Sequence, residues 1–191
     1  MKAPGVDVRP LRQITGDAHF NEVFLTDVFV PDGDVIGDVN QGWSVARATM
    51  GNERLVIGST ITHVSPDRLL DLVAHRAPER SPLRQEVGAI VAEHHALTML
   101  DLRRSMRSVL GGEPGPEGNV TKLLGNELDQ RITEVAMRLL GPDAAAVDGD
   151  LSYWGYQFLF TRAYTIGGGT SEMSRNAIAE RILGLPRDPG R

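Results

Sequence analysis

The sequence of 191 residues contains no cysteine, which excludes disulfide bonds and thiolate metal sites. It also lacks a run of about 18 apolar residues, the length that a membrane-spanning helix needs. The first residues, MKAPGVDVRP, have no apolar core of the kind found in signal peptides. An excess of positive charge is absent as well, because the formal net charge is −5, and nothing electrostatic supports nucleic-acid binding. We therefore expect a cytoplasmic protein with no membrane span and no nucleic-acid partner.

What the chain does contain fits one sizeable domain, or one domain with an appendage. Residues 6–36 are rich in Val, Phe and Thr, with turn residues at Gly16-Asp17 and Pro31-Asp32-Gly33, and this pattern predicts two or three strands. So small a β segment does not form a stable sheet alone, because isolated hairpins are marginal in water. We expect residues 1–38 to be a partial β-domain and residues 39–191 to form a helical domain.

Helical periodicity begins at Gln41. Five apolar residues at steps of three, four and seven predict one face of a long first helix: Trp43, Ala46, Met50, Ile57 and Val64. Trp43 is expected in the core. Further helices are expected at about 82–110, from a cap at Asn119 to Gly141-Pro142 with Leu124, Leu128, Ile132, Val135 and Leu139 on one side, within 151–163, and at the C-terminus. Short connections between helices favour a mainly α, antiparallel helical bundle after the short β segment.

The most informative stretch is YTIGGGTSEMSRNAIAERILGLPR, from Tyr164 to Arg187. Its three successive glycines let backbone approach a ligand closely, since no Cβ stands in the way. The helix that follows, capped by Thr170 or Ser171 and stopped at Gly184, offers unpaired N–H groups and a positive dipole end. The pattern predicts either a platform for a polar ligand or a plain glycine-rich connector.

Glu53 falls on the apolar face of the first predicted helix. A carboxylate that faces the inside of a bundle is costly unless it is paired or functional. Burial would raise its pKa toward neutrality, where a general base works best. From the pattern alone three interpretations stay open: a catalytic base, an ion pair with another helix, or a helix rotated so that Glu53 and Arg54 lie at the solvent edge.

The run from Tyr164 to Arg187 resembles the C-terminal signature of the acyl-CoA dehydrogenases, which are FAD-dependent enzymes. The stretch FNEVFLTDVFVPDGDVIGDVNQGWSVARATMGNER, from Phe20 to Arg54, is similar to that family's passage from the middle β-domain into the C-terminal helical bundle. The resemblance covers residues 4–187. The family has an N-terminal helical domain and a full β-domain before this point, which implies that the chain is a fragment or that another polypeptide supplies the missing half.

The resemblance implies α,β-dehydrogenation of an acyl-CoA thioester. Most members carry the catalytic Glu directly before the Gly-Thr of the C-terminal loop, and here that position is Gly168. A minority carry it in a Glu-Arg pair on the first bundle helix, where this chain has Glu53 and Arg54. The resemblance thus implies Glu53 as the base for the α-proton, Arg54 and Gly169 as substrate-side residues, and FAD as the hydride acceptor.

The resemblance also implies a set of flavin contacts. Three residues match the flavin-contacting residues of the family's C-terminal loop: Thr170, Ser171 and Glu172. Arg138 and Gly141 stand where the family has a Gln-x-x-Gly-Gly element that contacts the flavin of a neighbouring subunit. No metal ligand is expected.

The implied partners are an acyl-CoA substrate, an electron-transfer acceptor, and either a second copy or a homologous subunit in a dimer or tetramer. The altered Gln-x-x-Gly-Gly element resembles a bacterial subfamily, including sterol-degrading members, in which some subunits do not bind flavin. A non-catalytic partner subunit of a heteromeric dehydrogenase is therefore the alternative function.

Overall fold

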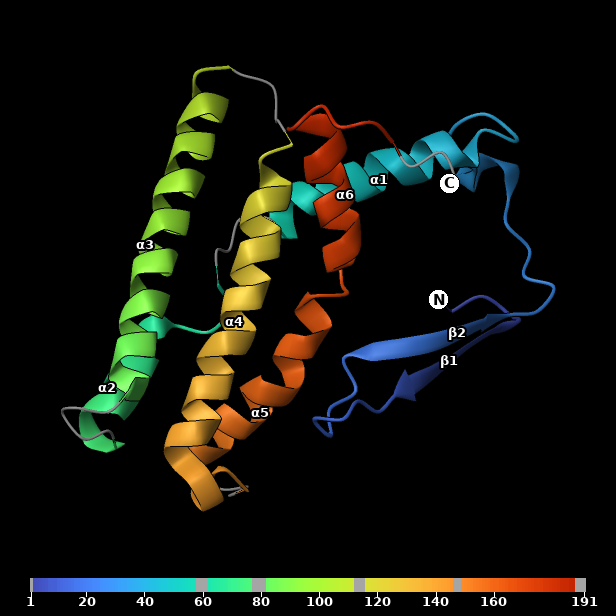
Figure 1. Cartoon of the computed structure of the whole chain (residues 1–191). Coiled ribbons are helices and arrows are strands. Elements are labelled where there is room, and N and C mark those ends of the chain that lie inside the picture. The colour runs from blue at the N-terminus through green and yellow to red at the C-terminus, as the bar shows by residue number, and fades with distance from the viewer. Residues whose placement is uncertain (1, 58–61, 77–81, 112–115, 146–148, 188–191) are drawn as a thin grey trace. The chain divides into compact units, whose positions relative to one another are not determined.

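The computed structural model describes residues 2–57, 62–76, 82–111, 116–145 and 149–187, without the side chains of residues 51–57, 108 and 149–151 (Figure 1). The chain forms two compact units, Met1–Val56 and Ile57–Arg191. The domain boundary predicted between residues 38 and 39 stays a prediction. The mainly helical architecture with a short β segment is confirmed: the described residues contain six α-helices and one pair of strands.

The β segment is a hairpin of β1 (Val6–Leu11) and β2 (Phe20–Leu25). The strands are antiparallel, and the register places Val8 opposite Val23 and Arg9 opposite Glu22. Because opposite residues share a face, the first pair belongs to a mainly apolar face and the second to a face that mixes charged and apolar residues. All residues of β2 are exposed. A 3-10 turn, η1 (Asp32–Asp34), and helix α1 (Gly42–Ile57) follow in this unit.

The larger unit consists of helices packed around α4 (Gly118–Leu140). The helix α4 contacts α2 (Pro66–Arg76), α3 (Pro82–Val109), α5 (Gly149–Tyr164) and α6 (Ser171–Arg181), and a 3-10 turn, η2 (Gly141–Ala145), extends it. Helices α3 and α4 run side by side in opposite directions (Figure 1). The predicted antiparallel arrangement of these two helices is therefore confirmed.

The apolar side of α4 carries the core, as its sequence pattern predicts. Leu128, Ile132 and Val135 are fully buried, while Leu124 and Leu139 pack partly buried against the same cluster. Ala136 and Leu140 of α4 belong to the same cluster. The other core members come from the segment before α2 and from α2, α3 and α5: Val64, Leu69, Val73, Val87, Ile90, Leu97 and Trp154.

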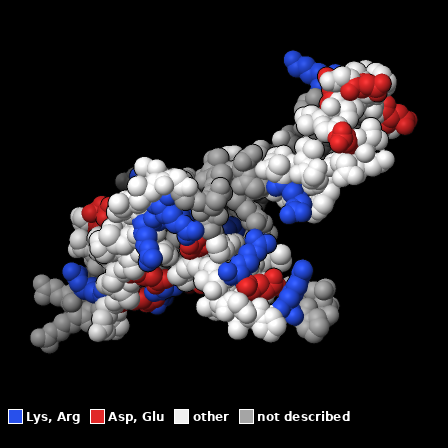
Figure 2. All heavy atoms as spheres, turned by 90° about the horizontal axis from the view of Figure 1, so that it is seen from above, with Lys and Arg blue, Asp and Glu red and all other residues white. Residues whose placement is uncertain are grey.

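Charged residues on the other sides of α4 connect it to three neighbours. Four ion pairs do so: Glu127–Arg175 to α6, Arg131–Glu93 and Arg138–Glu86 to α3, and Glu134–Arg162 to α5. Figure 2 shows basic and acidic side chains next to one another on the face in view. Each pair is partly exposed, so each contributes at most about 1 kcal/mol to the free energy of unfolding.

Two details of the predicted helices are wrong. The first helix ends at Ile57, and Val64 belongs to a non-helical segment before α2. Pro66 explains the start of a new helix there, because proline lacks an N–H and fits the first helical turn. Asn119 is not the cap of α4, which begins one residue earlier at Gly118; its side-chain amide instead donates to the Pro116 carbonyl oxygen over 3.0 Å.

Trp43 is also not in the core, because it is 70% exposed on α1. Two aromatic residues of α5 pack together: Trp154 is buried and Tyr153 lies against it edge to face.

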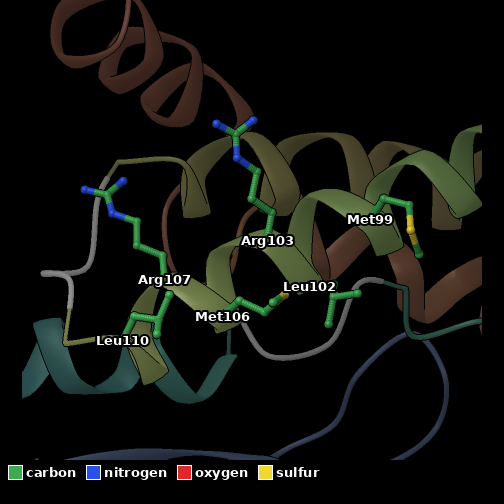
Figure 3. A pocket seen from close by; sticks show the side chains of 6 residues that line it. All are labelled: Met99, Leu102, Arg103, Met106, Arg107 and Leu110. Atoms are coloured by element: carbon green, nitrogen blue, oxygen red, sulfur yellow. The ribbon is translucent and has the colours of Figure 1, made fainter.

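A shallow hollow lies along the second half of α3 and just beyond its end (Figure 3). Four exposed apolar residues line it together with Arg103 and Arg107: Met99, Leu102, Met106 and Leu110.

Candidate functional site

The glycine segment, residues 164–170, forms a tight turn between α5 and α6. The Gly167 N–H donates to the Ala163 carbonyl oxygen over 2.8 Å, and the Gly169 N–H donates to the Ile166 carbonyl oxygen over 3.2 Å. Gly168 and Gly169 have φ angles of 67° and 110°. These angles lie in the left-handed region that favours glycine, so the turn requires the sequence found there.

The start of α6 is capped as predicted, but its first N–H groups already have partners. Thr170 is the N-cap, and its Oγ1 accepts a hydrogen bond from the Met173 N–H over 3.3 Å. The Ser171 N–H donates to the Thr165 carbonyl oxygen over 3.1 Å. The pKa of Glu172 is lowered by hydrogen bonds from its own backbone N–H and from Thr170. The expectation of unpaired donors at this end is therefore wrong, although the positive end of the helix dipole remains.

One face of α4 holds this turn through side chains at four-residue spacing. The Lys122 Nζ donates to the Gly169 carbonyl oxygen. The Asn126 Nδ2 donates to the Tyr164 carbonyl oxygen over 2.6 Å, and the Gln130 Nε2 donates to the Thr165 Oγ1 over 3.3 Å. Residues at i, i+4 and i+8 project from the same side of a helix, so a single face meets the turn along its length.

A buried carboxylate lies next to this face. Asp129 is fully buried and accepts hydrogen bonds from the backbone N–H groups of His63, over 2.9 Å, and Val64, over 2.9 Å. Burial raises the pKa of Asp129 to about 6, against the lowering effect of the two backbone donors. Burial also lowers the pKa of His63. The His63 ring stacks on the Tyr164 ring, with centroids 3.7 Å apart.

Sequence reasoning missed these contacts of α4. The available signal was the row Lys122, Asn126 and Gln130, a polar stripe beside the apolar face, together with an acid at position 129 among buried residues. The stripe alone does not reveal its target, because the turn is about 40 residues away in sequence and meets it only in the fold.

The structure places Arg138 and Gly141 away from the turn within one chain. Arg138 lies eight residues beyond Gln130, the nearest of the three α4 residues that hold the turn, which corresponds to about 12 Å along the axis of α4. Its Nη2 donates to the Glu86 Oε1 over 2.6 Å. Gly141, with a φ of 56°, ends the helix, and its N–H donates to the Met137 carbonyl oxygen.

The predicted base is at Glu53 on α1, next to Arg54. The side chains of both residues lie outside the description, so their roles stay predictions. Within the described residues, no group of three His, Asp or Glu side chains is arranged to hold a metal ion. None of the helices in the described ranges has the length and apolar character needed to cross a membrane.

Comparison with known families adds the decisive observation. Residues 40–183 match the model of the acyl-CoA dehydrogenase C-terminal domain. The chain belongs to the acyl-CoA dehydrogenase family. This match covers α1, the glycine turn and the α4 face that holds it.

Two curated acyl-CoA dehydrogenases of Mycobacterium tuberculosis are close in sequence. FadE34 is 38% identical over 98% of the chain, which spans 26% of that relative. IpdE1 is 38% identical over 97% of the chain, which spans 49% of that relative. The chain thus spans half or less of the length of these curated acyl-CoA dehydrogenases.

Solved structures agree on the fold. The Tcur3481-Tcur3483 steroid ACAD superposes with a TM-score of 0.80 at 21% identity, over 97% of this chain and 50% of that one. The ChsE4-ChsE5 complex from Mycobacterium tuberculosis superposes with a TM-score of 0.74 at 20% identity, over 98% of this chain and 52% of that one. At these identities the likeness shows that the acyl-CoA dehydrogenase fold is shared.

Proposed function

We propose that this chain provides the C-terminal part of an FAD-dependent acyl-CoA dehydrogenase, with Glu53 as the base that removes the α-proton of the thioester. The observation that supports it most is the glycine turn. Gly168 takes the position where most members of the family carry the catalytic acid, and Glu53 stands at the alternative position on α1. In this proposal the glycine turn carries no acid of its own, and the base comes from α1.

The residues of the turn fit a flavin nucleotide. A Cβ added at Gly169 would meet no heavy atom within 4 Å, so the backbone there faces open space. The Lys122 ammonium at the Gly169 carbonyl and the positive end of the α6 dipole favour a phosphate-bearing ligand. We propose that Thr170, Ser171 and Glu172 contact the cofactor, which supplies a hydride acceptor when bound.

The chain's own residues perform three tasks in this proposal. Glu53 takes the α-proton, and Arg54 orients the carboxylate or the substrate. The Gly169 backbone lets the thioester approach, because no side chain stands in the way. Arg138 and Gly141 contact the flavin of a neighbouring subunit. The working form is then a dimer or tetramer, and electrons leave to a separate acceptor.

A non-catalytic partner role is the second candidate, because the chain spans half or less of its curated relatives. In that case an upstream polypeptide or a homologous subunit supplies the missing half and the flavin chemistry. The two candidates differ in what Glu53 does. In the enzyme it takes a proton from substrate, whereas in the partner it has no chemical task.

The test is to produce the chain together with the polypeptide that completes it and to compare the wild type with Glu53→Gln. We expect a yellow protein in both cases, and a loss of acyl-CoA oxidation by at least about a hundredfold in the variant, because the general base is gone. Glu180→Gln, on the exposed end of α6, is the matched control and should keep full activity. Full activity in Glu53→Gln would overturn the assignment of the base, and a colourless complex would favour the partner role.

A further inference from the structure

The carboxylate of Asp129 holds a backbone segment that is distant in sequence. Its two oxygens accept the His63 N–H over 2.9 and 3.0 Å, and one of them also accepts the Val64 N–H over 2.9 Å. No ion pair to Asp129 is present among the described residues, and its partners are backbone donors. Burying a charge without a cation costs free energy, so an acid is a costly way to provide an acceptor for two backbone N–H groups.

The segment held by Asp129 reaches the glycine turn through one side chain. The His63 ring lies on the Tyr164 ring with an angle of 12° between their planes. Tyr164 is the last residue of α5 and the first of the glycine segment. Its carbonyl oxygen also accepts a hydrogen bond from the Asn126 side chain. The start of the turn is therefore fixed twice, directly by α4 and indirectly through His63.

Both restraints come from the same part of α4. Asp129 follows Asn126 by three residues and Lys122 by seven, and these spacings place all three on one side of a helix. That side contacts the turn at Tyr164 and Gly169 and the preceding segment at His63. A shift of His63 would leave Tyr164 without its stacking partner while the direct contacts from α4 remain.

We propose that Asp129 is a positioning residue for the glycine turn, acting through the backbone of His63 and the stacked His63 and Tyr164 rings. The inference rests on the proposed function in one respect, namely that the ligand of the turn is a flavin. Asp129 itself touches neither the turn nor a ligand. It sets where the His63 ring lies, and the ring restricts the rotation of Tyr164 at the point where the turn begins.

The test measures hydrogen exchange at the turn amides of the full chain with its completing polypeptide, together with the flavin absorbance of the same samples. Asp129→Asn weakens the hold on the His63 N–H, and His63→Ala removes the stack while leaving the Asp129 bonds. In both variants we expect the Gly167 and Gly169 amides to exchange at least about threefold faster and the flavin content to fall. Asp101→Asn removes a carboxylate paired with Arg104 within α3 and should change neither.

Asp129→Asn and His63→Ala together distinguish a failure of the proposed restraint from a failure of the flavin assignment. If Asp129→Asn fails to fold, His63→Ala alone decides, because it keeps the carboxylate and its backbone donors. Wild-type exchange at the turn in His63→Ala overturns the inference, as does faster exchange in variants of a flavin-loaded complex whose flavin content and spectrum stay those of the wild type. If the wild-type complex holds no flavin but both variants still exchange faster, the flavin assignment fails and the restraint of the turn by Asp129 stands.

Discussion

The imidazole ring of His63 lies nearly parallel to the phenol ring of Tyr164, with 3.7 Å between centroids and 12° between planes. The two residues are about 100 positions apart in sequence, and the chain between them includes α4. It connects the segment before α2 to the last residue of α5, immediately before the glycine turn.

The stack itself should be replaceable by another flat ring. His63→Phe keeps a planar side chain over Tyr164, whereas His63→Ala removes it. We expect His63→Ala to lower the free energy of unfolding by at least about 0.5 to 1.5 kcal/mol more than His63→Phe, since that is the range for an aromatic pair beyond its buried area and the alanine loses the buried area as well. Urea denaturation followed by circular dichroism measures the difference. Equal stability of the two variants would mean that the stacked rings contribute nothing to the free energy of unfolding.

Asp129 should make stability depend on pH between about 4 and 6. Its folded pKa of about 6 lies above the ordinary value of 3.8, so between these values the folded state binds a proton that the unfolded chain has lost. The stabilisation is complete below pH 3.8 and is lost as the pH rises through 6. The full loss is roughly 3 kcal/mol, from about two pKa units at 1.36 kcal/mol each.

The measurement is the free energy of unfolding of the wild type and of Asp129→Asn between pH 4 and 7.5. Other titrating groups contribute equally to both proteins and cancel in the difference. We expect the wild type to lose stability relative to the variant as the pH rises through this window. A difference that stays flat contradicts the raised pKa of Asp129.

Removing the amide of Asn126 should loosen the start of the turn. Asn126→Ala leaves the Tyr164 carbonyl oxygen without its side-chain donor in a largely buried place. We expect a loss of about 1 to 3 kcal/mol in the free energy of unfolding, the usual cost of a buried group left unsatisfied. Asn119→Ala is the matched control, because it removes a similar bond at the start of the same helix. Faster exchange of the turn amides in the control but not in Asn126→Ala would contradict the assignment.

Gly169 should be sensitive to a methyl group for conformational reasons. Gly169→Ala introduces no clash within 4 Å, but a φ of 110° is unfavourable for an L residue and should cost roughly 1 to 3 kcal/mol. Gly88→Ala, on an exposed part of α3 with no such φ, should instead gain about 0.5 to 1 kcal/mol. Thermal unfolding of both variants checks the opposite signs, and a destabilised Gly88→Ala would show that a general sensitivity to substitution explains the result.

Local signals predicted a large share of the fold. The periodicity of Leu128, Ile132 and Val135 identified the buried side of α4, and Gly141-Pro142 marked its end. A cap at Thr170 or Ser171 was predicted from their place after the glycines, and the structure has Thr170 as the cap. These predictions succeed because side-chain spacing, capping and the backbone freedom of glycine act over a few neighbouring residues.

The site depended on information that is not local. Val64 has the spacing of a continued first helix, yet Pro66 starts a new helix and Asp129 accepts hydrogen bonds from the backbone of His63 and Val64 just before it. The role of Asn126 follows only from the position of Tyr164, which is set by how α4 packs against α5. A sequence pattern shows that a polar residue sits beside an apolar face, but not which distant backbone group it meets.

The central place of α4 has a consequence for how this chain can change in length. Inserting one residue between Lys122 and Gln130 would rotate the two parts of the helix by about 100° against each other. The contacts to the turn, to His63 and to the neighbouring helices lie on fixed sides of that helix, so all of them would be misdirected at once. Natural insertions and deletions should therefore accumulate between α3 and α4 and be excluded from the stretch between Lys122 and Thr133.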